Sequence, residues 1–209
     1  MFGDAPLTFW EFAMKDPLPV GKIQETLFQF LHGREDVVLF GAQAVNAYVS
    51  AARLTEDIDI MAVDAEAFAE EVRAFLAGEF HIAVRIRHVA KGAGFRVYQV
   101  RKPDNRHLVD VRQVDTLPPA DCVAGVMVMK PERLVASKVI SLAQRHDRPK
   151  AGTDRRDIAY MLLTFPAFKR MEGPVAEELA KLEAPLRAIE VWKEIVEAPL
   201  LPEDEDEGY

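Results

Sequence analysis

The sequence predicts an α+β fold, with a mixed α/β core over residues 20–129 followed by a helical subdomain over residues 130–200. Two observations support this prediction. Short apolar or alternating runs, bounded by turn-forming residues, recur through the first part and are typical of strands. Beyond Pro131, apolar residues recur at helical spacing instead. The 209 residues, 49% of them hydrophobic, suffice for one domain of ordinary size with a smaller appendage.

In the predicted core, helices and strands alternate before several strands follow one another. Apolar spacing predicts helices over residues 21–31 and 65–76, and Asp64 is placed to cap the second of them. An alanine-rich composition predicts a helix over residues 42–52. Apolar or alternating runs predict strands over residues 37–40, 57–62, 82–89, 95–100, 108–111 and 126–129. Lys91–Gly94 has the composition of a hairpin turn between two of these strands.

The remaining segments complete the predicted organisation. Helical spacing predicts helices over residues 134–142, 154–163 and 174–197, the last one interrupted at Pro185. Prolines make residues 1–19 irregular, and residues 201–209 form an acidic tail that we expect to be solvated.

Charge and cysteine content narrow the classes of function. The net charge is −8, and the acidic run 203–207 supplies −5 of it, which disfavours passive adhesion to nucleic acid but allows a local basic groove. A lone Cys122 excludes an intramolecular disulfide and a cysteine-based zinc site. No apolar run reaches the ~18 residues of a membrane span, and no signal peptide is evident, so we expect a cytoplasmic protein without a membrane partner.

Two carboxylates on one predicted strand are the first candidate for chemistry. Asp57 and Asp59 are two residues apart, so they point to one face of the strand, while Ile58 and Ile60 point to the other. Their Cα atoms are then ~6–7 Å apart, a separation at which a magnesium ion relieves the repulsion between the carboxylates. Asp110 joins them if its strand is a neighbour. The alternative is a pair of acidic residues at a solvent-exposed strand end.

A small-residue turn lies upstream of these carboxylates. Gly41-Ala42 ends an apolar strand and begins a helix, where a tight turn leaves backbone N–H groups facing an anion such as phosphate. An ordinary strand-to-helix turn is the alternative. The order of strand, Gly and small residue, helix, Asp-x-Asp and then a third strand Asp favours a nucleotide site.

This order resembles the Gly-[Gly/Ser]-x(n)-Asp-x-[Asp/Glu] signature of polymerase-β-like nucleotidyltransferases. The segment from Leu39 to Tyr48, with Arg53-Leu54-Thr55-Glu56-Asp57-Ile58-Asp59, is similar to the AbiEii/AbiGii toxin-type branch of that superfamily. In the C-terminal half, residues 130–138 and 145–158 resemble the Lys/Arg-rich helix and the Asp-x-x-Asp segment of the same branch. The resemblance covers roughly residues 35–165. It departs from the family at Ala42, where Gly or Ser is usual.

The resemblance implies a metal-dependent nucleotidyltransferase fold and a role for each candidate residue. Asp57, Asp59 and Asp110 are the expected catalytic and metal-binding residues, with Mg²⁺ or Mn²⁺ as the cofactor and a nucleoside triphosphate as the substrate. The expected nucleotide-binding residues are Gly41, Ala42, Lys138, Arg145, Arg148, Lys150 and Asp157. The implied acceptor is a tRNA end or a protein side chain, and an antitoxin protein is the implied partner.

Two other functions remain open on the sequence. The acidic body suits a cationic acceptor, as in a small-molecule nucleotidyltransferase that adenylylates an aminoglycoside-like compound. Ala42 is consistent with a catalytically inactive fold that serves as a binding or antitoxin module. The nucleotide, the acceptor, the oligomeric state and the effect of Ala42 on activity cannot be read from the sequence.

Overall fold

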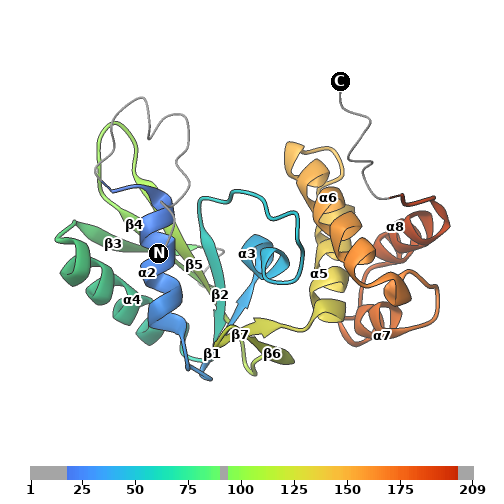
Figure 1. Cartoon of the computed structure of the whole chain (residues 1–209), viewed down its shortest axis with the longest axis horizontal. Coiled ribbons are helices and arrows are strands. Elements are labelled where there is room, and N and C mark those ends of the chain that lie inside the picture. Colours follow the sequence, from blue (N-terminus) through green and yellow to red (C-terminus); the bar gives the residue numbers. More distant parts are fainter. Residues whose placement is uncertain (1–17, 90–93, 202–209) are drawn as a thin grey trace. The chain divides into compact units, whose positions relative to one another are not determined.

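The computed structural model describes residues 18–89 and 94–201, which form two compact units (Figure 1). The first unit contains the residues up to Gln43 together with Leu54–Met129, and the second contains Ala44–Arg53 and the residues from Lys130 onward. The division drawn from the sequence assigned residues 44–53 to the core, whereas the chain packs this segment with the helices. The predicted α+β class is confirmed.

The first unit is built on one mixed sheet with the strand order β3-β4-β5-β2-β1-β7-β6. Its strands are β1 (Val37–Phe40), β2 (Ile58–Ala62), β3 (Val84–Val89), β4 (Gly94–Gln99), β5 (Arg106–Gln113), β6 (Ala120–Val123) and β7 (Val126–Met129). β2 pairs antiparallel with β1 and parallel with β5. Because β5 lies beside β2, Asp59 and Asp110 are direct register partners.

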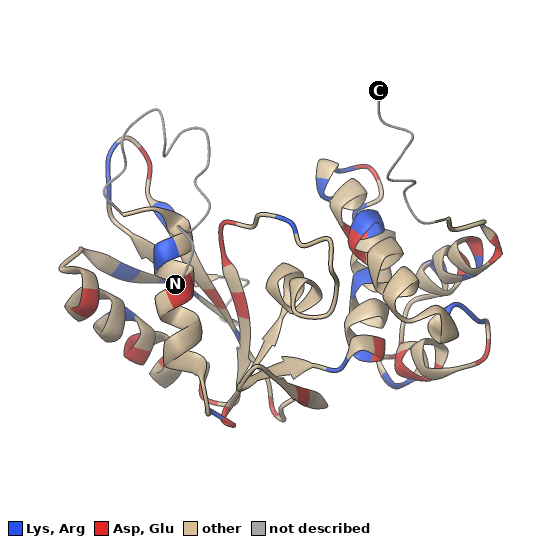
Figure 2. Ribbon diagram, in the orientation of Figure 1, with Lys and Arg blue, Asp and Glu red and all other residues tan. Residues whose placement is uncertain are grey.

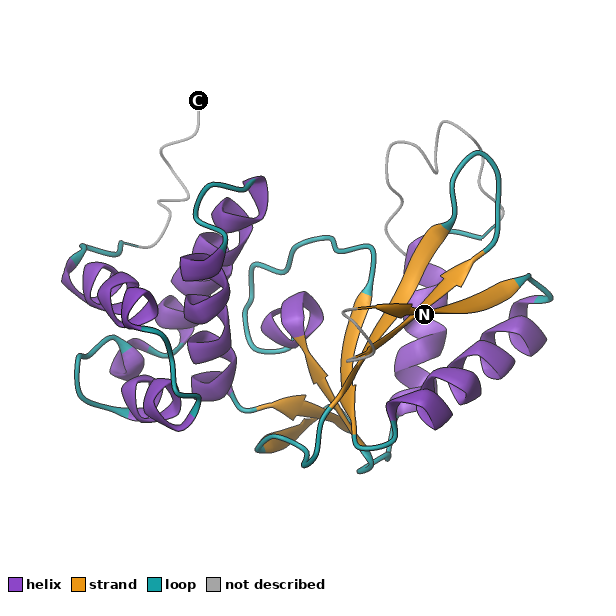
Figure 3. Ribbon diagram, turned by 180° about the vertical axis from the view of Figure 1, so that it is seen from behind, coloured by secondary structure: helices purple, strands orange, loops and turns teal. Residues whose placement is uncertain are grey.

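Two helices, α2 (Val20–Leu31) and α4 (Ala65–Phe80), cover the same face of this sheet (Figure 3). Phe30 of α2 stacks on Phe75 of α4, with their ring centroids 4.5 Å apart. Ile58 and Ile60 of β2 are fully buried, as their alternation with the two aspartates predicted. Asp64 caps α4 as predicted, because its side chain accepts a hydrogen bond from the backbone N–H of Ala67.

The helix predicted over residues 42–52 was too long, since α3 spans only Gly41–Asn46. Its end is fixed by the Asn46 side chain, which donates to the carbonyl of Arg53 and accepts from the N–H of Arg53. These two bonds close residues 47–52 into a loop, in competition with continued helix.

The sequence analysis missed β6. Its four residues lack a clear alternation, and it forms by pairing antiparallel with β7. The connection is a two-residue turn in which Ala124 and Gly125 both have positive φ, at 49° and 83°. The predicted hairpin turn at Lys91–Gly94 falls largely on residues 90–93, outside the described residues, as do residues 1–17 and the acidic tail from 202 onward.

The second unit is helical, as predicted. Its helices are α5 (Pro131–Gln144), α6 (Pro149–Thr164), the 3₁₀ helix η2 (Pro166–Phe168), α7 (Pro174–Lys181) and α8 (Leu186–Glu197). Proline starts α5, α6 and α7, where its missing N–H costs no helical hydrogen bond. Pro185 directly precedes α8, so the predicted interruption there is confirmed.

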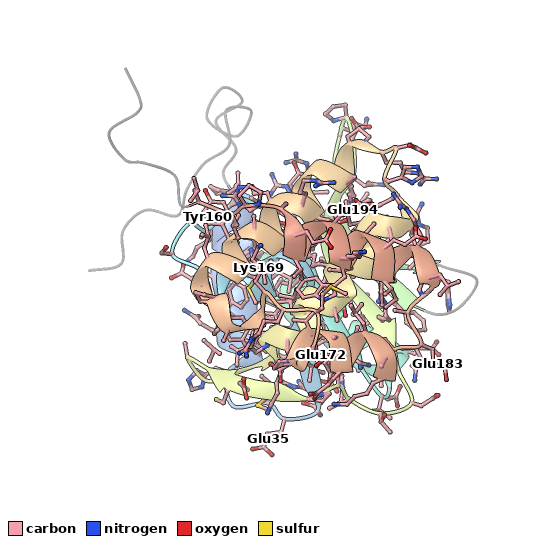
Figure 4. The ribbon with its side chains drawn as sticks, turned by 90° about the vertical axis from the view of Figure 1, so that its right-hand side faces the viewer. Glu35, Tyr160, Lys169, Glu172, Glu183 and Glu194 are labelled. Atoms are coloured by element: carbon pink, nitrogen blue, oxygen red, sulfur yellow. The ribbon has the colours of Figure 1, made fainter. Side chains whose placement is uncertain are left out.

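Contacts within this unit hold the helix ends in place. Lys169 (Figure 4) donates to the carbonyls of Val196 and Ala198, at 2.6 and 2.7 Å, where α8 ends with unpaired acceptors and a negative dipole end. Trp192 of the same helix is 1% exposed and belongs to the core. Among the described residues, no helix has the length and apolar character needed to cross a membrane.

Candidate nucleotide and metal site

Gly41 and Asp59 are fitted to one another at the end of β1. Phe40 is the register partner of Asp59, so the turn that follows β1 lies against the Asp59 side chain. A Cβ atom built on Gly41 would be 2.0 Å from the Asp59 Oδ2 atom, and the Gly41 φ of +72° is one that glycine adopts freely. The glycine at this position is therefore required by the place of the Asp59 carboxylate.

A buried glutamine of α2 connects the turn to the segment that precedes β2. Gln24 is 8% exposed; its amide nitrogen donates to the Thr55 carbonyl at 2.7 Å, and its amide oxygen accepts from Gln43 at 3.1 Å. The Thr55 hydroxyl in turn donates to the Asp57 carboxylate at 3.3 Å. Gln24 thus links the side chain of Gln43, two residues after Gly41, to the backbone of Thr55, two residues before Asp57.

Asp110 is engaged by an arginine of the neighbouring strand. Arg96 of β4 is the direct register partner of Asp110 on β5, and its Nε and one Nη each bond one carboxylate oxygen at 2.6 Å. This hydrogen bonding raises the pKa of Arg96 above its ordinary value, with smaller contributions from the charges of Asp57 and Asp59 and with burial acting in the opposite sense. Arg96 is therefore bonded to Asp110 and stabilised by the negative charge of the other two carboxylates.

The same face of the sheet carries further cations. Arg87 of β3 is the register partner of Arg96, and Arg112 of β5 lies over the Phe40 ring, 4.7 Å from its centroid. Arg85, opposite Tyr98, lies on this face as well. All three of these arginines are exposed, and Arg85 and Arg87 make no ion pair with any described residue. Figure 2 marks the Lys, Arg, Asp and Glu positions along the ribbon. The carboxylates thus lie at the edge of a basic surface.

The donor set suits a hard divalent cation. Asp59 on β2 and Asp57 directly before it offer carboxylate oxygens, which are the ligands that Mg²⁺ and Mn²⁺ prefer. In the described parts of the chain, however, no three His, Cys, Asp or Glu side chains form a group that could hold a metal ion. The bond to Arg96 explains this for Asp110, because both of its oxygens are taken up by the guanidinium.

In the second unit, three of the predicted basic and acidic residues form one buried network. The Lys138 ammonium bonds Asp157 at 2.7 Å and Asp154 at 3.2 Å, and Arg145 lies 3.0 Å from the other oxygen of Asp154. Arg53 bonds both oxygens of Asp157, at 2.9 and 3.1 Å. Because Arg53 ends the 44–53 segment, this network attaches that segment to α5 and α6.

Asp157 is the most buried member of this network, with no exposed surface. Its burial favours the neutral acid, but the hydrogen bonds from Arg53 and Lys138 and the positive charges of these residues outweigh that effect and lower the pKa of Asp157. The carboxylate is therefore charged at neutral pH. It holds Lys138, whose side chain is only 12% exposed, in one orientation.

The other predicted nucleotide-binding residues have different surroundings. Arg148 and Lys150 are exposed at the start of α6 and remain accessible to an anion. Ala42 is 7% exposed, so its methyl group faces the interior.

The sequence analysis did not single out Arg53, Arg96, Gln24 or Asp154 as site residues. Arg53 lies within the motif that carried the family resemblance, four residues before Asp57, and this position was a usable signal. The one sign of Arg96 in the sequence was its position as a charged residue within the predicted strand 95–100. Asp154 is the first acid of the Asp-x-x-Asp segment in the resemblance, so its position was also a usable signal. Gln24 bonds Thr55, 31 residues away in the sequence, and gave no signal.

Solved structures with a similar fold are nucleotidyltransferases. The Megavirus polyadenylate synthase superposes with a TM-score of 0.60 at 9% identity, over 75% of this chain and 34% of the viral chain. The antibiotic-resistance factor ANT(2'')-Ia superposes with a TM-score of 0.50 at 14% identity, over 82% of this chain and 92% of that chain. This chain thus spans about a third of the viral enzyme, and at these identities the likeness shows the fold. No curated protein matches the sequence.

The sequence itself matches a family model. The model of the nucleotidyl transferase AbiEii toxin, of type IV toxin–antitoxin systems, matches residues 25–194 and confirms the resemblance carried by the motifs. The chain is therefore a nucleotidyltransferase that belongs to the AbiEii toxin family.

Proposed function

We propose that this protein is a metal-dependent enzyme that transfers a nucleoside monophosphate from a nucleoside triphosphate to a hydroxyl acceptor and releases pyrophosphate. The main support is the Asp59 carboxylate, which lies against a glycine turn and is in register with Asp110. Asp57 and Asp59 would hold Mg²⁺ or Mn²⁺, and Asp110 would join them once it is released from Arg96. The cation would neutralise part of the negative charge of the triphosphate.

In the proposed reaction, the acceptor oxygen attacks the α-phosphorus in line. A new oxygen–phosphorus bond forms while the α–β phosphoanhydride bond breaks, so that pyrophosphate leaves. Asp110 orients the acceptor hydroxyl and accepts its proton. We propose that the backbone N–H groups of Gly41 and Ala42 donate hydrogen bonds to the phosphates. Such bonds do not require a side-chain hydroxyl at residue 42.

For the second unit, we propose that the cations of α5 and α6 bind the nucleotide phosphates. Arg148 and Lys150 are exposed and suited to this role without rearrangement. Lys138 and Arg145 would contribute from the buried network, in which Asp157 orients Lys138. Arginine binds phosphate oxygens in pairs, whereas lysine acts as a point charge.

We propose an RNA end, such as that of a tRNA, as the acceptor, because the exposed arginines beside the carboxylates favour a polyanion. A protein hydroxyl is the next candidate. An aminoglycoside-like acceptor is less well supported, since a cationic substrate would meet the same arginines. An antitoxin protein is the proposed partner, in keeping with the toxin family.

Calorimetric titration of each nucleoside triphosphate with Mg²⁺ tests the proposal. The wild-type protein should bind at least one triphosphate only when the metal is present. The Asp57→Asn, Asp59→Asn double variant should lose about 100-fold or more in affinity, because it removes two anionic ligands of similar shape. Asp115→Asn, which removes an exposed carboxylate beyond β5, is the control and should bind as the wild type does. Metal-independent binding, or equal binding by the double variant, would contradict the proposal.

A further inference from the structure

The Arg96–Asp110 pair places a cation where the proposed reaction needs a metal ligand. Both Asp110 oxygens accept hydrogen bonds from one guanidinium at 2.6 Å, in the bidentate geometry that is strongest for this pair. Each side chain is 25% exposed, so the pair is partly withdrawn from solvent. The contact follows from strand register, because the two residues are directly opposite on β4 and β5.

The Arg96–Asp110 pair lies among other negative charges, so Arg96 does more than connect two strands. Asp59 is the register partner of Asp110, and Asp57 directly precedes β2, so both add negative charge near Asp110. Without a cation, three carboxylates in one place repel one another. Arg96 bonds Asp110 with both of its paired N–H groups, so its guanidinium offsets part of the negative charge that a metal ion would otherwise neutralise.

We propose that Arg96 is a positioning residue that holds Asp110 in the metal-free protein and gives it up when a divalent cation binds. This inference rests on the proposed function. A divalent cation bound to the Asp110 oxygens would meet the positive charge of the guanidinium that bonds the same two oxygens at 2.6 Å, so the two cations compete for this carboxylate. Metal binding is therefore coupled to the release of Arg96, which becomes free to meet phosphate oxygens on the same face.

The coupling predicts a gain of metal affinity when Arg96 is removed. If the pair only stabilises the sheet, removing Arg96 would lower the stability of the protein and leave the metal affinity unchanged or weaker. A pair that competes with the metal would raise the metal affinity, because Asp110 becomes available without breaking a charge-assisted bond. We expect a roughly tenfold gain, of the order that one charged hydrogen-bonded pair is worth.

The test is a titration of the protein with Mn²⁺ alone, without nucleotide. Binding is measured by calorimetry and by the paramagnetic resonance signal of the free Mn²⁺. Arg96→Gln should bind Mn²⁺ about tenfold more tightly than the wild type. Arg96→Lys keeps the charge but cannot bond both oxygens in the paired geometry of arginine, so its Mn²⁺ affinity should lie between those of the wild type and Arg96→Gln. This variant also keeps the inference testable if Arg96→Gln misfolds. Arg87→Gln removes an equal charge from the facing strand and should change the affinity less than about threefold.

A double-mutant cycle ties the effect to Asp110. In an Asp110→Asn background, Arg96→Gln should give no further gain in Mn²⁺ affinity. Thermal unfolding should show a lower midpoint for metal-free Arg96→Gln and a larger rise on adding Mn²⁺ than the wild type shows.

Two results would overturn the inference. One is Mn²⁺ binding by Arg96→Gln that equals or falls below the wild-type affinity. The other is an equal gain in Arg87→Gln, which would make the effect one of general charge. Failure of the proposed function is recognised separately, because then the Asp57→Asn, Asp59→Asn variant would bind Mn²⁺ as well as the wild type does.

Discussion

Gly41 and Asp59 occupy adjoining space, and this contact makes the turn sensitive to a single methyl group. In Gly41→Ala, the added Cβ would approach the Asp59 carboxylate to 2.0 Å, in a backbone conformation that costs alanine about 1 kcal/mol by itself. Asp59 must therefore move, and we expect nucleotide binding with Mg²⁺ to fall by more than tenfold, with a lower midpoint of thermal unfolding. Calorimetry and a thermal scan measure the two effects.

The matched control is Gly78→Ala, in α4 of the same unit. A Cβ at Gly78 meets nothing within 4 Å, so alanine should stabilise the helix by about 0.5–1 kcal/mol and leave binding unchanged. Wild-type binding by Gly41→Ala would show that the Asp59 position is not needed.

At the residue scale, the alternation of apolar and polar residues predicted which side chains of β2 are buried. The two-residue period of a strand predicted that Ile58 and Ile60 are buried on the face opposite Asp59, because alternation needs no knowledge of distant partners. Arg96 could not be recognised in the same way. Its role depends on the register between β4 and β5, which shifts at Val97/Tyr98 and is set by pairing across the whole hairpin.

At the scale of elements, α6 brings a buried carboxylate into contact with two other segments. Asp157 bonds Arg53, which ends the 44–53 segment, and Lys138 on α5. Removal of its charge leaves Arg53 without this ion pair and Lys138 with Asp154 as its remaining carboxylate in this network. We expect Asp157→Asn to lower the free energy of unfolding by about 3 kcal/mol, measured by urea denaturation at pH 7. Glu172→Gln, an exposed position before α7 (Figure 4), should change it by less than about 0.5 kcal/mol.

The same contacts predict how stability depends on pH. The pKa of Asp157 is lowered from its ordinary value near 3.8, so the stabilisation is fully present above that value and is lost as the pH falls through the lower pKa of the folded state. Arg53 and Lys138 stay charged over this range. Denaturation between pH 5 and pH 2 should show a steeper loss for the wild type than for Asp157→Asn, and equal slopes would show that the carboxylate is not paired.

The helix predicted over residues 42–52 shows where reasoning from a single element fails. Its alanine-rich composition favours helix, and propensity alone predicts the longer element. The Asn46 side chain bonds the backbone of Arg53 instead, and the Arg53 guanidinium bonds Asp157 on α6. The end of α3 therefore depends on contacts made more than a hundred residues away in the sequence, which no window of local sequence contains.

At the scale of the whole molecule, overall charge and local charge point to different partners. The net charge of −8 disfavours binding of nucleic acid, whereas the sheet face beside the carboxylates presents Arg85, Arg87 and Arg112 exposed. Composition sums over every surface, so it could not predict that these cations share one face. That arrangement follows from strand pairing, which places alternate residues of β3 and β5 together.

If this face guides an RNA end to the carboxylates, binding must depend on salt and on each arginine. Each phosphate contact contributes about 0.7 to the slope of log affinity against log salt for a single strand, so Arg85→Gln, Arg87→Gln, Arg112→Gln together should lower that slope by about 2. Fluorescence anisotropy with a short labelled RNA bearing a free 3′ hydroxyl, titrated at several salt concentrations, measures it. Arg73→Gln is the control, because Arg73 lies on α4, on the helix-covered side of the sheet, and already pairs with Glu70. An unchanged slope in the triple variant would remove the main reason for preferring RNA, and a protein or small-molecule hydroxyl would become the acceptor to test.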